Sequence, residues 1–233
     1  TDIHLCNSEI VWMGFKQMLP ISIFVAAFGA AFGLAASKAG VSEGMSIMMS
    51  AMIFAGASQF AVLDLWGHQL PIATLILTVF AINARHILMG ATLYPWLTQL
   101  SVKQRYGIMI VASDANWAMS LQAFYRGQSG FGLLFGGGIS LWLFWVLGTW
   151  IGVYYGSAIN NSADYGLDMV MGCFLLAITM GGDKNILILL IWTVVGSVSL
   201  LAYWYLPANS HVIVGAIAGG LSGLLGREQS HER

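Results

Sequence analysis

Charged residues are scarce in this chain of 233 residues, where Asp, Glu, Lys and Arg together make up 8%. A typical soluble domain carries roughly 25%. Hydrophobic residues make up 58%, more than a soluble fold can cover with polar side chains, so we expect an integral membrane protein. The formal net charge of -1 excludes a basic surface for nucleic acid or anionic lipid.

Cysteine is also scarce, since only Cys6 and Cys173 are present. Neither has a CxxC neighbour or a plausible set of metal ligands, so no disulfide framework, metal site or cofactor site is expected. P-loop, HExxH and GxSxG motifs are missing as well. An ATP-driven pump or a recognisable membrane hydrolase therefore lacks its motif, and we expect a secondary transporter or channel rather than an enzyme.

The hydrophobic residues form long runs separated by short polar connections. This pattern predicts one all-α transmembrane domain over residues 1–233, a polytopic helix bundle of seven or eight spans. The fourth run, with its single acid, could instead be an amphipathic surface helix, and the second or sixth could be re-entrant. The predicted spans are residues 19–37, 44–63, 69 or 71 to 90, 106–125, 131–158, 169–180, 186–206 and 212–225.

Glycine spacing predicts where helices pack closely. Four-residue spacings create small faces that let a neighbouring helix approach, and they occur in the first, fifth and last predicted spans. Matching the first and fifth spans suggests two weakly repeated halves, residues 15–126 and 131–226, with interruptions at 56–59 and 179–182. The uncharged run 131–158 is long enough to require a tilt, or a kink at Gly136–Gly138. The spaced glycines are Gly29, Gly33, Gly148, Gly152, Gly215, Gly219 and Gly223.

The segment FAGASQF, residues 54–60, combines a helix-weakening glycine with two hydrogen-bonding side chains inside an uncharged run. Gly56, Ser58 and Gln59 are consistent with polar contacts that hold helices together. They are equally consistent with a broken helix whose freed backbone groups line a substrate site. Both interpretations stay open.

A second segment, NARHILMG at residues 83–90, places a cation within an apolar run. Counting about nine residues back from Tyr94, at a helical rise of about 1.5 Å, puts Arg85 more than about 10 Å inside the membrane interface. An ionisable residue at that depth normally faces a polar cavity and has a partner. Asp114, in the string SDANW, is the only acid between Asp64 and Asp164 and is the expected partner.

These polar residues suit a zwitterionic ligand. Arg85 offers a bidentate fork for a carboxylate, and Asp114 can pair with an ammonium group. Alternatively, the two could pair only with each other, which lowers the cost of burial. His86 could carry a proton or could be a hydrogen-bonded core residue. The candidate substrate-binding residues are Phe54, Gly56, Ser58, Gln59, Asn83, Arg85, His86, Asp114, Asn116 and Trp117, with Phe60 and Met89 as further walls.

Taken together, FAGASQF, NARHILMG and SDANW resemble the motifs of the AzlC family, the large subunit of bacterial branched-chain amino acid exporters (the YgaZ type), and the resemblance covers nearly the whole chain. It implies a multi-pass protein of the bacterial cytoplasmic (inner) membrane that exports valine, leucine and isoleucine, with methionine a further candidate. It also implies a small AzlD-type membrane partner. Similar proteins often read Thr-Asp-Glu where this chain has Ser113, Asp114 and Ala115, so a mechanism that needs two adjacent carboxylates is in doubt.

Two other classes of function are compatible with the composition. A non-transporting membrane scaffold or assembly subunit would use the polar residues only to hold a partner's helices. A membrane-embedded enzyme using His86 and Asp114 is disfavoured because no nucleophile and metal set accompanies them.

Overall fold

The computed structural model describes residues 8–66, 72–155, 176, 185–206, 211, 214–215 and 217–223. Across these residues the chain forms helices and turns without a strand, which confirms the predicted all-α class. Long apolar helices able to cross a membrane occupy Ser8–Lys38, Leu75–Leu97, Phe131–Tyr155 and Ile186–Tyr205. The sixth predicted span and the interruption expected at 179–182 lie outside the described residues.

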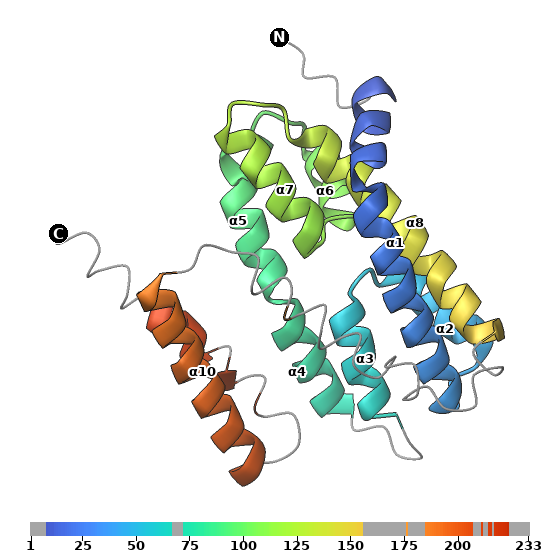
Figure 1. Ribbon diagram of the computed structural model, residues 1–233, viewed down its shortest axis with the longest axis vertical. Helices are drawn as coiled ribbons and strands as arrows, with labels where there is room; N and C mark the ends of the chain where they lie inside the picture. Colours follow the sequence, from blue (N-terminus) through green and yellow to red (C-terminus); the bar gives the residue numbers. More distant parts are fainter. Residues whose placement is uncertain are drawn as a thin grey trace.

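Two long helices form the framework. α1 (Ser8–Lys38) and α8 (Phe131–Tyr155) run in parallel and pack along their length (Figure 1). A Cβ atom added to Gly29 would lie 2.5 Å from the carbonyl oxygen of Trp145, and one added to Gly152 would collide with the carbonyl oxygen of Ala30. The spaced glycines of the first and fifth predicted spans therefore face each other, as close helix packing requires.

α8 continues as an α-helix through the glycines at 136–138. These glycines allow neighbouring segments to approach closely. A Cβ on Gly136 would meet the carbonyl oxygen of Val11, and one on Gly138 would meet that of Val111. The choice between a tilt and a kink stays a prediction.

The second predicted span is interrupted. α2 (Glu43–Met52) and α3 (Gly56–Asp64) are separated by residues 53–55, which are not helical. Ser42 caps α2 by accepting a hydrogen bond from the Met45 amide at 3.4 Å. The break expected around FAGASQF is confirmed, and it falls just before Gly56.

The third predicted span consists of α4 (Ile72–Asn83) and α5 (Arg85–Leu97), joined at Ala84. The third predicted span ended at residue 90, but α5 continues to Leu97, so this end was placed too early. Met89, Leu93 and Leu97 are four residues apart and all buried on one face of α5. The helix continues because burial of this apolar face stabilises it more than the neighbouring polar side chains destabilise it.

The fourth predicted span is interrupted too, so the expectation of a continuous helix over 106–125 was wrong. α6 (Val102–Ile110) and α7 (Asp114–Tyr125) are separated by residues 111–113. The amide of Ser113 donates to Oδ1 of Asn116 at 2.6 Å, a reciprocal contact typical of a capping box. Asp114 is therefore the first residue of α7 rather than the middle of a span.

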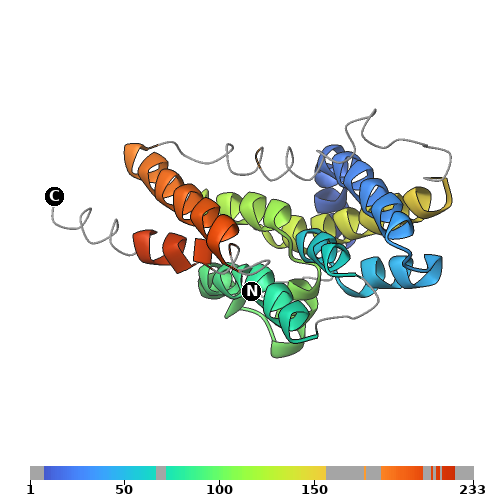
Figure 2. The ribbon, with the colours of Figure 1, turned by 90° about the horizontal axis from the view of Figure 1, so that it is seen from below.

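The seventh predicted span matches α10 (Ile186–Tyr205). Figures 1 and 2 place α10 at the opposite edge of the molecule from α2. Of the last glycines, Gly215 and Gly219 face Ser199 and Val195 of α10, whereas a Cβ on Gly223 would meet nothing within 4 Å. The two-halves prediction stays a prediction, because residues 156–175 are not described.

The packing of α1 on α8 generates a stability prediction. Gly152→Ala places a methyl group against the Ala30 backbone, and we expect it to destabilise the fold by about 1–3 kcal/mol. Gly196→Ala, on α10 in open space, should be neutral or stabilising by up to about 1 kcal/mol because alanine favours helix. Thermal unfolding in detergent measures both, and equal effects would contradict close packing at Gly152.

Candidate functional site

A cavity of about 60 Å³ lies where the three helix interruptions meet. Its apolar lining comes from α1, α8 and the α2–α3 break. Its polar lining comes from the start of α5 and the α6–α7 break. The apolar group comprises Val25, Phe28, Phe54, Ala55, Gly56, Ala57, Leu141 and Trp145, and the other group comprises Arg85, His86, Ser113, Asp114 and Ala115.

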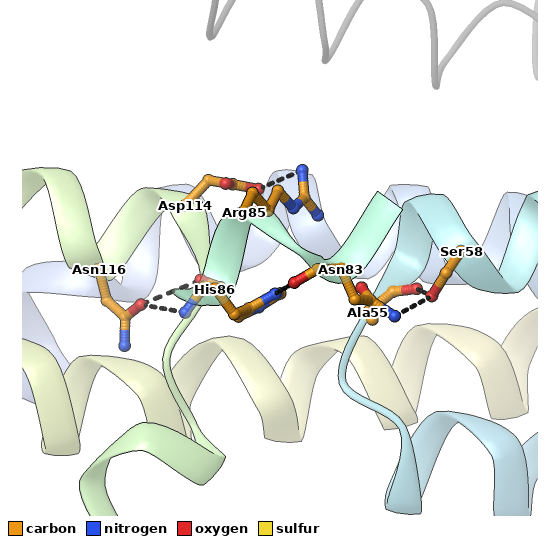
Figure 3. Close-up of polar contacts among 8 residues, drawn as sticks. Ala55, Ser58, Asn83, Arg85, His86, Asp114 and Asn116 are labelled. Carbon is orange, nitrogen blue, oxygen red and sulfur yellow. Dashed lines mark hydrogen bonds and ion pairs between the residues drawn. The ribbon is translucent and has the colours of Figure 1, made fainter. Parts of the chain in front are cut away.

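Arg85 and Asp114 form an ion pair on this cavity, as the sequence predicted. Nη1 of Arg85 lies 2.9 Å from Oδ2 of Asp114, and the two side chains are 32% and 25% exposed (Figure 3). Each begins a helix, Arg85 of α5 and Asp114 of α7. The positive end of a helix dipole stabilises Asp114 but destabilises Arg85, so the cation depends on its partner.

The Arg85 guanidinium retains unused hydrogen-bonding capacity. Its Nε is buried and has no partner among the described residues. A buried donor without an acceptor is costly, and an anion that entered the cavity could satisfy it. The pair thus satisfies the charge of Arg85 but leaves part of its hydrogen-bonding fork open.

Asn83, Ser58 and His86 support the edges of the site (Figure 3). Asn83 Nδ2 donates to Ser58 Oγ at 3.2 Å, and Ser58 Oγ donates to the Ala55 carbonyl at 2.9 Å. Ser58 thereby adds a second hydrogen bond to a carbonyl at the α2–α3 break that also accepts from the Gln59 amide. FAGASQF is thus both a helix break and a set of packing contacts, so its two interpretations are compatible.

His86 lines the cavity and is anchored through one ring nitrogen. Its Nδ1 lies 3.1 Å from the Asn83 carbonyl oxygen. Because a carbonyl can only accept, Nδ1 carries the proton in the neutral ring and Nε2 is an acceptor. The ring is therefore both hydrogen-bonded and positioned on the cavity.

Five candidates from the sequence do not line the cavity. Asn116 is 0% exposed and donates to the carbonyls of Val111 and Leu134 at 2.9 and 2.7 Å, so it holds the α6–α7 break to α8. Trp117 donates to Thr92 Oγ1 at 2.9 Å and packs in a separate core cluster. Asn83, Ser58 and Gln59 lie behind the lining rather than in it.

Of the four walls proposed from the sequence, only Phe54 lines the cavity. Phe60 stacks on Phe28 with ring centroids 5.1 Å apart, and Met89 is buried on α5. Sequence analysis missed Phe28 and Trp145, because the register of α1 against α8 is not visible in the sequence. The one available signal was the Trp145 N–H group, which requires a partner in an uncharged span.

The arrangement presents groups that complement a small molecule with an anionic group, a cationic group and an apolar side chain. Arg85 and Asp114 supply the charges, and Phe28, Leu141 and Trp145 supply apolar surface. No group of three potential His, Cys, Asp or Glu metal ligands occurs in the described part of the chain.

The ion pair generates a coupling prediction. Asp114→Asn should destabilise the fold because Arg85 loses its counter-charge, and Arg85→Gln should do so for the converse reason. The double variant should cost less than the sum by about 1–3 kcal/mol. Thermal unfolding provides the values. Arg105→Gln is the control. Among the described residues Arg105 bonds only the Leu100 and Thr98 carbonyls, so its substitution should be additive with Asp114→Asn. If the destabilisation caused by the two substitutions at Arg85 and Asp114 is additive, the ion pair contributes no coupling free energy and the prediction is contradicted.

Comparisons with known proteins identify the family. No curated protein and no solved structure matched the chain. The model of one protein family, described as AzlC protein, matches residues 20–159. This match includes most of α1, all of α2 to α8 and every residue on the cavity. Because it extends over more than half of the 233 residues, the chain belongs to the AzlC family.

Proposed function

We propose that this membrane protein is the large subunit of a secondary transporter that exports branched-chain amino acids across the bacterial cytoplasmic membrane. Valine, leucine and isoleucine are the proposed substrates, with methionine as a further one. Membership of the AzlC family, a transporter-type family, supports the general role. The observation that carries the proposal is the Arg85–Asp114 pair on a cavity with apolar walls.

A zwitterion complements this pair. Its carboxylate would take the guanidinium fork of Arg85, whose Nε is unsatisfied, and its ammonium group would take the carboxylate of Asp114. The substrate would thus replace the contact between the two residues with one contact to each of its own ends. Because both charges stay paired, the exchange costs little electrostatic free energy.

Loading requires the site to open. A cavity of about 60 Å³ holds about four waters, which is less space than leucine needs. The cavity borders three helix interruptions, and interrupted helices allow half-helices to move against a fixed framework. We propose alternating access in which these segments move against α1 and α8, with proton or membrane-potential coupling.

We also propose a small AzlD-type membrane subunit as the partner. The support is the family membership together with α10, which is long, apolar and only 6% buried. Lipid alone could cover such a helix, so the partner is best tested through function. Flux of a leucine analogue into proteoliposomes should be high with both subunits and low with this chain alone. Full flux from this chain alone would refute the need for the partner.

The competing proposal is a membrane scaffold that transports nothing. Its polar residues would serve only packing, as Asn116 does in this structure. A scaffold would show no substrate-dependent flux with its partner present. That result would overturn the exporter.

Substitutions of the pair test the proposed binding mode. Asp114→Asn should abolish leucine export while the protein stays folded and bound to its partner, because the ammonium group loses its counter-charge. Arg85→Lys keeps the charge but loses the fork, so it should raise KM by about tenfold. Arg105→Lys, outside the cavity, is the matched control and should leave KM unchanged.

The charge reversal sharpens this test. Arg85→Asp combined with Asp114→Arg keeps a pair and should restore stability, but not export, because the substrate would have to bind in the reverse orientation. Leucine export at the normal rate by Asp114→Asn would show that the pair is structural and that binding occurs elsewhere, with Gly56–Gln59 the next candidate.

A further inference from the structure

Trp145 forms one wall of the cavity. Its side chain is 2% exposed and lines the cavity. It meets Phe28 edge to face, with ring centroids 5.2 Å apart. On another side it abuts α3, since a Cβ added to Gly56 would lie 2.9 Å from Cη2 of the indole. The indole thus forms an apolar wall enclosed by three elements.

A closed ring of hydrogen bonds fixes this indole. Trp145 Nε1 donates to Gln59 Oε1 at 3.1 Å, and Gln59 Nε2 donates to Ser50 Oγ at 3.3 Å. Ser50 Oγ lies 2.8 Å from Thr149 Oγ1, which donates to the Trp145 carbonyl at 3.0 Å. The ring therefore begins and ends on Trp145.

The direction of each hydrogen bond follows from chemistry. An indole nitrogen can only donate and a carbonyl can only accept. Thr149 uses its single hydroxyl proton on the Trp145 carbonyl, so Ser50 must donate to Thr149 and accept from Gln59. Each hydrogen bond of the ring therefore has one direction, and the amide orientation of Gln59, which is 1% exposed, is determined.

We propose that Trp145 sets the size of the side chain that the site accepts, and that Gln59 is the positioning residue that holds its indole. This inference rests on the proposed amino acid transport. Gln59 does not line the cavity, so it acts through Trp145. Its ring of bonds also joins α2, α3 and α8 across the α2–α3 break, which keeps the wall in place where the span is interrupted.

The effect of the size of an apolar pocket on substrate specificity has a known magnitude. One methylene in an apolar pocket changes the specificity of a protein by about 10- to 200-fold. Replacing the indole by a smaller ring enlarges the apolar part of the cavity, while the Arg85–Asp114 part is unaltered. Transport of substrates with larger side chains should increase relative to leucine, and recognition of the zwitterion should be unchanged.

The test compares competing substrates in proteoliposomes that contain both proposed subunits. Labelled leucine is transported against unlabelled alanine, valine, methionine and phenylalanine. Trp145→Phe should lower the preference for leucine over phenylalanine by about tenfold. Gln59→Leu, which removes the acceptor of the indole N–H, should shift the ranking in the same direction by a smaller factor.

Ser22→Ala is the matched control. Ser22 is as buried as Gln59. Its hydroxyl bonds the Met18 carbonyl and Ser140 Oγ, the latter at 2.8 Å between α1 and α8, and it does not line the cavity. It should lower flux for all substrates equally, or not at all, and preserve their ranking. If the role of Gln59 is purely structural, Gln59→Leu should preserve the substrate ranking, as Ser22→Ala does.

The outcomes are distinguishable. A changed ranking in Trp145→Phe and in Gln59→Leu supports both roles. An unchanged ranking in Trp145→Phe overturns the inference and leaves the proposed transport standing. If Trp145→Phe does not fold, Gln59→Leu becomes the deciding variant because it keeps the indole. An unchanged substrate ranking in Gln59→Leu would then overturn the inference. Absence of flux from the wild-type pair of subunits overturns the proposed function, and this inference with it.

Discussion

The ion pair between Arg85 and Asp114 is the constraint on which the site depends. An arginine in an apolar helix pair is unfavourable, and its place at the start of α5 adds the repulsion of the helix dipole. Asp114 compensates both effects from the start of α7, 2.9 Å away. Two helices therefore begin beside each other at the cavity, each after an interruption of its predicted span.

Interrupted helices expose backbone groups, and neighbouring side chains satisfy these groups here. Asn116 donates to the carbonyl of Val111 at the α6–α7 break. At the α2–α3 break, Ser58 adds a second hydrogen bond to the Ala55 carbonyl, which also accepts from the Gln59 amide. In an apolar environment each unsatisfied group would cost several kcal/mol. The polar residues of the second and fourth predicted spans are thus needed, before any role in binding, to stabilise the helix breaks. Their effect is to bring charged side chains and short helices to one cavity.

The framework and the interrupted segments have different mechanical properties. α1 and α8 contact each other backbone to backbone at glycines such as Gly29 and Gly152, where even one methyl group would collide. Such close packing favours a rigid pair. The broken helices α2–α3 and α6–α7 contact the framework through side-chain hydrogen bonds, for example Gln59 with Trp145, and at the close approach of Gly138 to the Val111 carbonyl. Movement that opens the cavity is therefore expected in the broken helices.

The sequence by itself determined the all-α membrane class, the extent of α10, the glycine faces of α1 and α8, and the partnership of Arg85 with Asp114. These follow from local properties: apolar run length, four-residue spacing, and the cost of an isolated charge in an apolar segment. Only the tertiary structure decided that Asp114 starts a helix, that Gly136–Gly138 meet neighbouring segments closely, and that Trp145 is a cavity wall. Helix breaks and walls depend on which distant groups satisfy a freed carbonyl or an indole N–H, and a sequence pattern does not contain that pairing.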